Sequence, residues 1–127
     1  MNNYMPSPQF LPGANTISIV SHPPEIAPGT PVKIVKPWFG NLCAVQLPDG
    51  MIHRWFAWFE LRSENCCLTP GSFATVMNST GHGNPPRVNV GTRVRIVKCI
   101  PTFFYDLMLS NGEYHRWLAE FELANPI

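Results

Sequence analysis

Two short stretches carry the residue types best suited to bind a ligand: His53-Arg54-Trp55 and, 62 residues later, His115-Arg116-Trp117. An indole ring stacks on apolar or flat groups, and imidazole and guanidinium groups donate hydrogen bonds. One interpretation is a recognition face on a strand, with histidine and tryptophan on one side and arginine on the other. The alternative is structural. Each tryptophan then packs against the other copy of the motif, and each arginine pairs with Glu60 or Glu122.

Other aromatic residues occur in one copy of this pattern and not in the other. Trp38-Phe39 corresponds to Ile100-Pro101, and Trp58 corresponds to Glu120. Aromatic side chains in loops that no core requires indicate a binding surface, although they can also cap the end of a barrel. The candidate ligand-binding residues are therefore Trp38, Phe39, His53, Trp55, Trp58, His115 and Trp117.

The sequence contains no motif for catalysis or metal binding. The four histidines and four cysteines are far apart, and no Cys-x-x-Cys pair is present. The adjacent Cys66 and Cys67 are poorly placed to bridge each other, so we expect free, mostly buried thiols, including Cys43 and Cys99. No nucleophile stands in a recognisable arrangement with a base and an acid. We therefore expect no metal, no cofactor and no enzymatic activity.

The chain repeats itself. Residues 29–61 and 91–123 align without a gap, and 15 of the 33 aligned positions are identical. Similarity extends upstream, where Pro-Gly precedes an apolar stretch and a loop with a proline pair in each copy. An internal duplication explains this pattern. It predicts a flexible N-terminal arm at residues 1–10, a first domain at 11–68 and a second domain at 69–127.

Each copy has the alternation of short β-strands. We expect a strand in the apolar stretch before the proline pair, then Val32 and Ile34 in a second strand, a variable loop, and a third strand at 42–47. Asp49-Gly50 and Asn111-Gly112 indicate hairpins with type I′ turns. A further strand, one 3₁₀ turn and a last short strand would complete each copy. Such a small sheet must curl into a barrel or pair with its twin to bury one face.

This order of elements resembles bacterial Src-homology-three-like barrels. The matching features are Gly-Thr-x-Val-x-Ile-Val, the Asp/Asn-Gly hairpin, Arg54-Trp55-Phe56 or Arg116-Trp117-Leu118 in the next strand, and a final Glu-Leu. The resemblance implies an all-β fold of two tandem barrels that pack together, and a binding or docking role without enzymatic activity. The acidic loop and tyrosines of proline-peptide-binding members are absent, so that ligand class is not implied.

Composition gives further expectations about partners and location. Charged residues make up 13% of the chain, and the net charge is +1. A strongly charged partner is therefore not indicated. We expect a binding or scaffolding module for a protein or peptide. Nucleic acid is the alternative, bound along a basic stripe formed by Lys33, Lys36, Arg95 and Lys98. No transmembrane span or signal sequence is apparent, so we expect a cytoplasmic protein without membrane contact.

Overall fold

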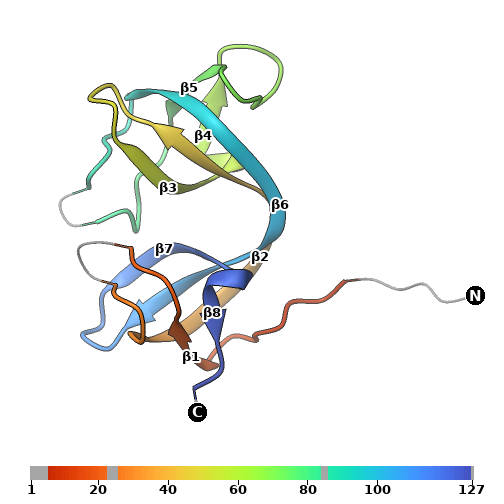
Figure 1. Cartoon of the computed structure of the whole chain (residues 1–127), viewed down its shortest axis with the longest axis vertical. Helices are drawn as coiled ribbons and strands as arrows, with labels where there is room; N and C mark the ends of the chain where they lie inside the picture. Colours follow the sequence, from red (N-terminus) through yellow and green to blue (C-terminus); the bar gives the residue numbers. More distant parts are fainter. Residues whose placement is uncertain (1–5, 23–25, 84–85, 127) are drawn as a thin grey trace, which may run out of the picture.

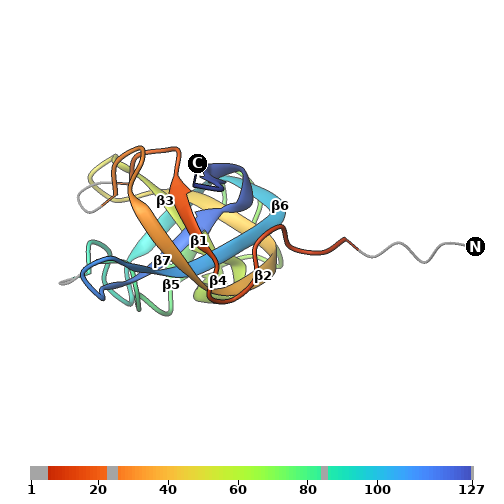
Figure 2. The ribbon, with the colours of Figure 1, turned by 90° about the horizontal axis from the view of Figure 1, so that it is seen from below.

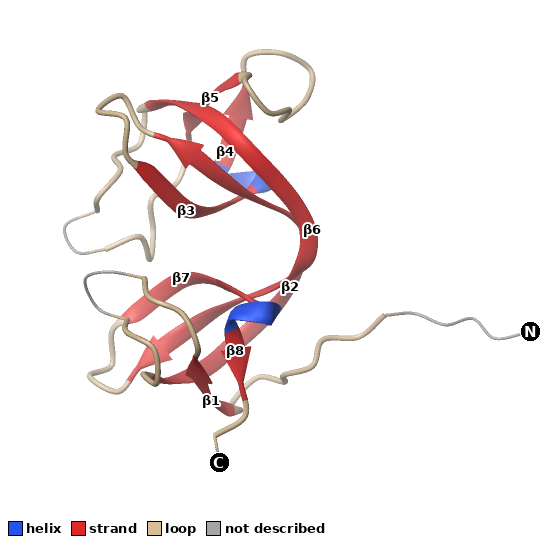
Figure 3. Cartoon of the chain, viewed as in Figure 1, coloured by secondary structure: helices blue, strands red, loops and turns tan. Residues whose placement is uncertain are grey.

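The computed structural model describes residues 6–22, 26–83 and 86–126. These residues form an all-β protein with eight strands in one antiparallel sheet (Figure 3). No helix among them is long and apolar enough to cross a membrane. The elements are β1 (Asn15–Ser18), β2 (Pro31–Gln46), β3 (Ile52–Ala57), η1 (Trp58–Glu60), β4 (Leu61–Ser63), β5 (Phe73–Val76), β6 (Arg93–Leu109), β7 (Tyr114–Ala119), η2 (Glu120–Glu122) and β8 (Leu123–Ala124), where η marks a 3₁₀ turn.

The long strands β2 and β6 extend through both lobes of the molecule (Figure 1). They pair antiparallel along almost their whole length, from Val32 opposite Leu109 to Gln46 opposite Arg95. The first lobe contains β1, the start of β2, the end of β6, β7, η2 and β8. The second lobe contains β5, the start of β6, the end of β2, β3, η1 and β4. Each lobe therefore uses strands from both copies of the repeat.

The expectation of two closed barrels is wrong, because the sheet is open with the strand order β4-β5-β6-β2-β1-β8. The strand that precedes each proline pair joins the last strand of the other copy: β1 pairs with β8, and β5 pairs with β4. Backbone groups that would have closed a barrel within one copy are thus satisfied between copies. Strand pairing marks no boundary between residues 68 and 69, so the division into two domains stays a prediction from the repeat.

The core consists of three clusters, one in each lobe and one between the lobes. The first lobe buries Val32, Ile34, Tyr105, Leu107 and Leu118 with their neighbours. The second buries Val45, Phe56, Val76, Val94 and Ile96 with theirs. The central cluster consists of Leu42, Ala44, Trp55, Ala57, Phe104, Trp117 and Ala119. It joins the lobes through side chains from both copies.

The variable loop expected between Val35 and Leu42 is instead part of β2. Pairing with β6 satisfies the backbone through this stretch, and a register shift between Ile34 and Lys36 precedes Pro37. Gly40 has φ of +149°, and a Cβ added there would contact the indole of Trp58. A side chain at position 40 would thus be both strained and obstructed.

The two hairpins form where Asp-Gly and Asn-Gly indicate them, but their turns are not type I′. The N–H of Gly50 donates to Leu47 O, and the N–H of Leu47 donates to Met51 O. Gly50 has positive φ, whereas no non-glycine residue among those described does. This is the three-residue loop with glycine in the last position. The Asp49 carboxylate also accepts from Met51 N at 3.0 Å, which explains the acidic residue.

The end of the predicted N-terminal arm is attached to the first lobe. Residues 1–5 lie outside the described residues, and the next residues extend away from the sheet (Figure 2). Phe10 is buried and its ring contacts Tyr105 edge-on at 5.7 Å. The arm is therefore anchored at residue 10 by burial of an apolar side chain.

The expectation that all four cysteines are free is wrong for two of them. Cys43 of β2 lies opposite Cys99 of β6 and forms a disulfide with it. Cys66 and Cys67 are free, as expected of an adjacent pair, but they are exposed and not buried as expected. The disulfide ties the two long strands together next to the central cluster.

Candidate functional site

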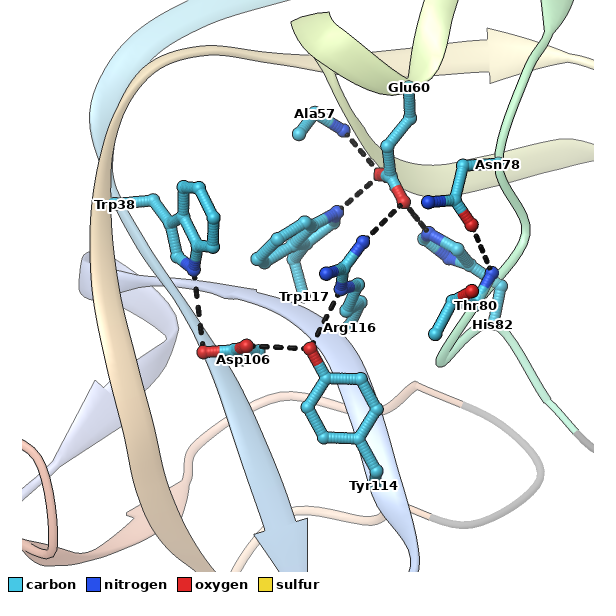
Figure 4. Close-up of polar contacts among 10 residues, drawn as sticks. All are labelled: Trp38, Ala57, Glu60, Asn78, Thr80, His82, Asp106, Tyr114, Arg116 and Trp117. Carbon is cyan, nitrogen blue, oxygen red and sulfur yellow. Dashed lines mark hydrogen bonds and ion pairs between the residues drawn. The ribbon is translucent and has the colours of Figure 1, made fainter.

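Glu60, at the end of η1, is a fully buried carboxylate that gathers groups from both copies (Figure 4). Within its own copy it accepts from the N–H of Ala57 at 2.9 Å, which closes the 3₁₀ turn. From the other copy it accepts from Trp117 Nε1 at 2.6 Å and from Arg116 at 3.3 Å. His82 Nε2 lies 3.0 Å from its second oxygen. A buried carboxylate is thus fully supplied with donors.

Glu122, at the end of η2, repeats this arrangement. It accepts from Ala119 N at 2.9 Å and from Trp55 Nε1 at 2.8 Å, and His22 Nε2 lies 3.0 Å from it. Burial would raise the pKa of Glu122, but the hydrogen bonds and charge of His22, with the other donors, hold that pKa below its ordinary value. Because a carboxylate only accepts, Nε2 of each loop histidine carries the hydrogen.

Trp55 and Trp117 do not form a ligand-binding surface. They are 1% and 0% exposed and pack in the central cluster. Each donates its indole N–H to the glutamate of the other copy, so they join the lobes. This is the structural alternative for the two motifs. The pairing of Arg116 with Glu60 agrees with it too.

The expected side-by-side placement of His53 and Trp55 is also wrong. Trp55 points into the central cluster, whereas the His53 ring contacts Phe56 of the second lobe at 4.8 Å. Strict alternation fails because the register shifts here: Cys43 lies opposite Phe56 and Ala44 lies opposite Arg54, so Trp55 is an extra, bulged residue of β3. The side chains of His53 and His115 therefore lie apart from those of Trp55 and Trp117 in the central cluster.

All four histidines of the chain line one pocket between the lobes. His22 and His115 come from the first lobe, with ring centroids 6.2 Å apart, and His53 and His82 come from the second, 5.4 Å apart. The cavity measures about 130 Å³. Its lining residues are Ser21, His22, Ile52, His53, Arg54, His82, Gly83, Arg87, His115 and Arg116.

The two strand histidines are held neutral. Burial, followed by the positive charge of neighbouring histidines, lowers the pKa of His115 to about 3. The pKa of His53 is lowered to about 3 by burial first and then by the charges of His82 and Arg87. Nε2 of His53 is buried and has no hydrogen-bond partner among the described residues. Such unpaired buried atoms are rare and require an explanation.

Three arginines surround the same pocket. Arg116 is half-buried and is held by Glu60 and by Tyr114 OH, which Arg116 Nε contacts at 2.8 Å. Arg54 and Arg87 are exposed, and the described part of the chain supplies no ion pair to either side chain. The pocket thus combines neutral imidazoles with cations at its rim.

Among the described residues, a chain of side-chain hydrogen bonds continues from Arg116 (Figure 4) but not from its counterpart Arg54. Tyr114 OH donates to Asp106 at 2.6 Å, and Trp38 Nε1 donates to the other oxygen of Asp106 at 3.4 Å. Residues Ile52 and Ala44 replace Tyr114 and Asp106 in the first copy. Arg116 is therefore fixed, whereas Arg54 is left exposed.

The unmatched aromatic residues lie on strand β2 and in η1, and not in loops. Trp38 is half-buried and packs against Phe59 and Trp117. Phe39 is 58% exposed and contacts Phe103, and Trp58 is 49% exposed. Phe39 and Trp58 are the expected ligand-binding aromatics that remain accessible. Neither lines the histidine pocket.

Two other arrangements considered from the sequence are not assembled. Lys33 and Lys36 lie in the first lobe, whereas Arg95 and Lys98 lie in the second, because β2 and β6 are antiparallel. The expected basic stripe is thus divided. Within residues 6–22, 26–83 and 86–126, no group of three or more histidine, cysteine, aspartate or glutamate side chains is placed to hold a metal ion.

The two loop histidines share a sequence signal, although neither was predicted as a site residue. Each copy has a histidine shortly before its proline pair: His22 before Pro23-Pro24, and His82 before Pro85-Pro86. The second loop is four residues longer, so the two histidines do not align. The glutamates were expected to meet arginines, and their role as acceptors for the tryptophans of the other copy was not apparent.

The fold and site define an all-β protein with an open, two-lobed sheet, and solved structures share that fold. A DUF1541 family protein, ydhK, from Bacillus subtilis superposes with a TM-score of 0.71 and 19% identity, covering 94% of this chain and 86% of that chain. A second crystal structure of ydhK superposes with a TM-score of 0.67 and 19% identity, covering 91% of this chain and 100% of that chain. The solution structure of the ydhK C-terminal domain superposes with a TM-score of 0.66 and 20% identity, covering 89% of this chain and 91% of that chain. No protein-family model and no curated protein matches the sequence.

Proposed function

We propose that the protein is a non-enzymatic binding module that recognises a protein or peptide partner at the pocket between its lobes. The convergence of all four histidines on one pocket carries this proposal. Polar groups held by a rigid scaffold, with no internal partner for one of them, are typical of a binding site. The long strands and the buried glutamates supply that scaffold.

The size of the pocket favours one projecting group of a larger partner. A cavity of about 130 Å³ is below the roughly 300–1,000 Å³ of sites that enclose drug-sized ligands. Ile52 lines the pocket and is 52% exposed, and its neighbour Met51 is exposed as well. An apolar rim around a polar pocket suits a peptide side chain or terminus with apolar neighbours.

The absence of enzymatic activity is part of the proposal. Ser21 is the hydroxyl that lines the pocket, and its Oγ lies 3.5 Å from Ile26 O. Among the described residues no serine or cysteine is hydrogen-bonded to a histidine that could act as its base. This supports binding over nucleophilic catalysis.

We also retain two finer proposals from the sequence. The order of hairpin, 3₁₀ turn and short strand in both copies supports a relationship to Src-homology-three-like barrels by internal duplication, with strands exchanged in the open sheet.

Nucleic-acid binding is the alternative function. The division of the basic residues between the lobes gives it less support than the pocket gives a peptide.

The disulfide bears on the compartment. Cytosolic proteins rarely keep structural disulfides, whereas oxidising compartments favour them. The Cys43–Cys99 bond therefore favours an oxidising compartment over the cytoplasmic location expected from the sequence. We propose that the protein functions under oxidising conditions.

A peptide-display selection against the full chain tests the proposed function. Enriched peptides are re-measured by calorimetry on wild type, on His53→Gln/His115→Gln and on Phe39→Ser, which alters an exposed aromatic outside the pocket. We expect binding to wild type and to Phe39→Ser, and at least about tenfold weaker binding to the histidine variant. Circular dichroism checks that each variant is folded.

Two results would contradict the proposal. One is a selection that enriches no peptide. The other is a set of peptides that bind the histidine variant as tightly as wild type, or that lose binding to Phe39→Ser instead. A single-stranded oligonucleotide added to the same proteins tests the alternative function.

A further inference from the structure

We propose that the pocket binds an oxyanion, a carboxylate or a phosphate group, between the two lobes. This inference rests on the proposed function only for its location, since it names the chemistry that the pocket accepts. The residues that carry it are Arg54, Arg87, His53 and His115.

The charges around the pocket favour a negative ligand. Arg54 and Arg87 are exposed at its rim, and the described residues offer them no carboxylate. Glu60 and Glu122 lie behind the loop histidines and are already supplied by Trp117 and Trp55. A guanidinium fork matches the geometry of a carboxylate or phosphate.

The imidazoles supply neutral donors deeper in the pocket. His53 Nε2 is buried without a partner among the described residues, and no side-chain hydrogen bond within them involves the imidazole ring of His115. A neutral imidazole has one N–H that can donate. Burial first, and then the positive charges nearby, lower the pKa of both rings, and those positive charges favour an anion.

Other ligand classes agree less well with these observations. A metal ion would require several converging lone pairs, and no group of three suitable side chains is placed for this in the described chain. The arginines would also repel it. A neutral ligand would leave the charges of Arg54 and Arg87 unused. A cavity of about 130 Å³ suits a single compact group.

Titration of the full chain with inorganic phosphate, and separately with acetate, tests this inference. Two-bond ¹H–¹⁵N spectra report the imidazole nitrogens of the four histidines at pH 7, with sodium chloride titrated to equal ionic strength as the baseline. We expect saturable shifts of His53 and His115 with at least one anion. Saturation by phosphate alone or by acetate alone identifies the group within the class.

A matched pair of variants separates specific binding from general charge. Arg54→Gln/Arg87→Gln removes the two rim cations, whereas Arg62→Gln removes an exposed cation on β4 that does not line the pocket. We expect at least about tenfold weaker anion binding in the first and no change in the second. Both substitutions are at exposed positions, and thermal unfolding confirms that the variants are folded.

The inference is overturned if neither anion exceeds the chloride baseline, if both variants bind as wild type, or if zinc gives the saturable shifts and the anions do not. The proposed function can fail independently. Anion binding without any enriched peptide would leave the site in place and remove the peptide partner. Peptides that bind at the pocket without an acidic group would support the peptide partner and contradict the oxyanion site.

Discussion

At the scale of single residues, burial of histidine makes stability depend on pH. The pKa values of His53 and His115 are about 3 in the folded protein and about 6.5 in an unfolded chain. Between these values the unfolded chain binds more protons, so acidification favours unfolding. The stability provided by the neutral rings is complete above pH 6.5 and is lost as the pH falls toward 3.

We therefore predict that the free energy of unfolding falls between pH 5.5 and 4.5 by about 1.4 kcal/mol per pH unit for each of the two histidines. Urea unfolding at a series of pH values measures this slope. His53→Gln/His115→Gln should lose most of it. Glu122 adds to the loss only below its ordinary pKa, since its own pKa is lower still. An equal slope in the variant would contradict the assignment.

Residue placement was only partly predictable. Alternation along a strand assigned His53 and Trp55 to one side, but a bulge at Trp55 in that same strand separates them. Nothing in the residue pattern of β3 indicates that Trp55 is an extra residue without a partner in β2. The predicted set of site residues contained His53 and His115 but lacked His22 and His82. These two lie in loops of unequal length, so the alignment of the two copies does not match them to each other.

At the scale of elements, the two 3₁₀ turns depend on buried glutamates that receive unequal support. Glu60 has four partners, which are Ala57, Trp117, His82 and Arg116. Glu122 has the equivalent backbone N–H, tryptophan and histidine, but no arginine among the described residues pairs with it. We predict that Glu60→Gln destabilises the protein by about 3–5 kcal/mol, because it leaves a charged partner unpaired. Glu122→Gln should be milder, at about 1–3 kcal/mol.

Urea unfolding at pH 7 measures both substitutions. Glu64→Gln is the matched control, since that carboxylate is exposed and pairs with Arg93 at the surface. Its unfolding midpoint should stay close to that of wild type. Equal losses of stability for Glu60→Gln and Glu122→Gln would contradict the proposed contribution of Arg116.

The order of elements was predictable, but their partners were not. Alternation, the Asp-Gly and Asn-Gly signals and the final Phe-Glu-Leu indicated hairpins and 3₁₀ turns, and these form. The two copies have nearly the same pattern, so β1 meets an equally suitable partner in β4 or in β8. Local signals do not distinguish exchange between copies from closure within one copy. The continuous β2 was missed because Pro37 and Gly40 are typical of a loop.

At the scale of the whole molecule, the disulfide closes a large loop across the sheet. Cys43 and Cys99 are 56 residues apart in the sequence. A loop of this length restricts the unfolded chain by up to about 4 kcal/mol in the chain-entropy account. We predict that Cys43→Ser/Cys99→Ser lowers the free energy of unfolding by about 2–4 kcal/mol.

Unfolding under non-reducing conditions measures this effect, with Cys66→Ser/Cys67→Ser as the control that should change little. Thiol titration of the denatured, unreduced protein should find two free thiols, those of Cys66 and Cys67. Four free thiols would contradict both the bond and the oxidising compartment that it favours.

The exchange of strands has a consequence for how the molecule assembles. Neither copy of the repeat, β1–β4 or β5–β8, contains a complete lobe. The chain is therefore built like two intertwined subunits joined by the link between β4 and β5. That link holds them at a high effective concentration. A molecule nicked there would consist of two pieces that can rebuild a core only by binding each other, and its stability would then depend on protein concentration.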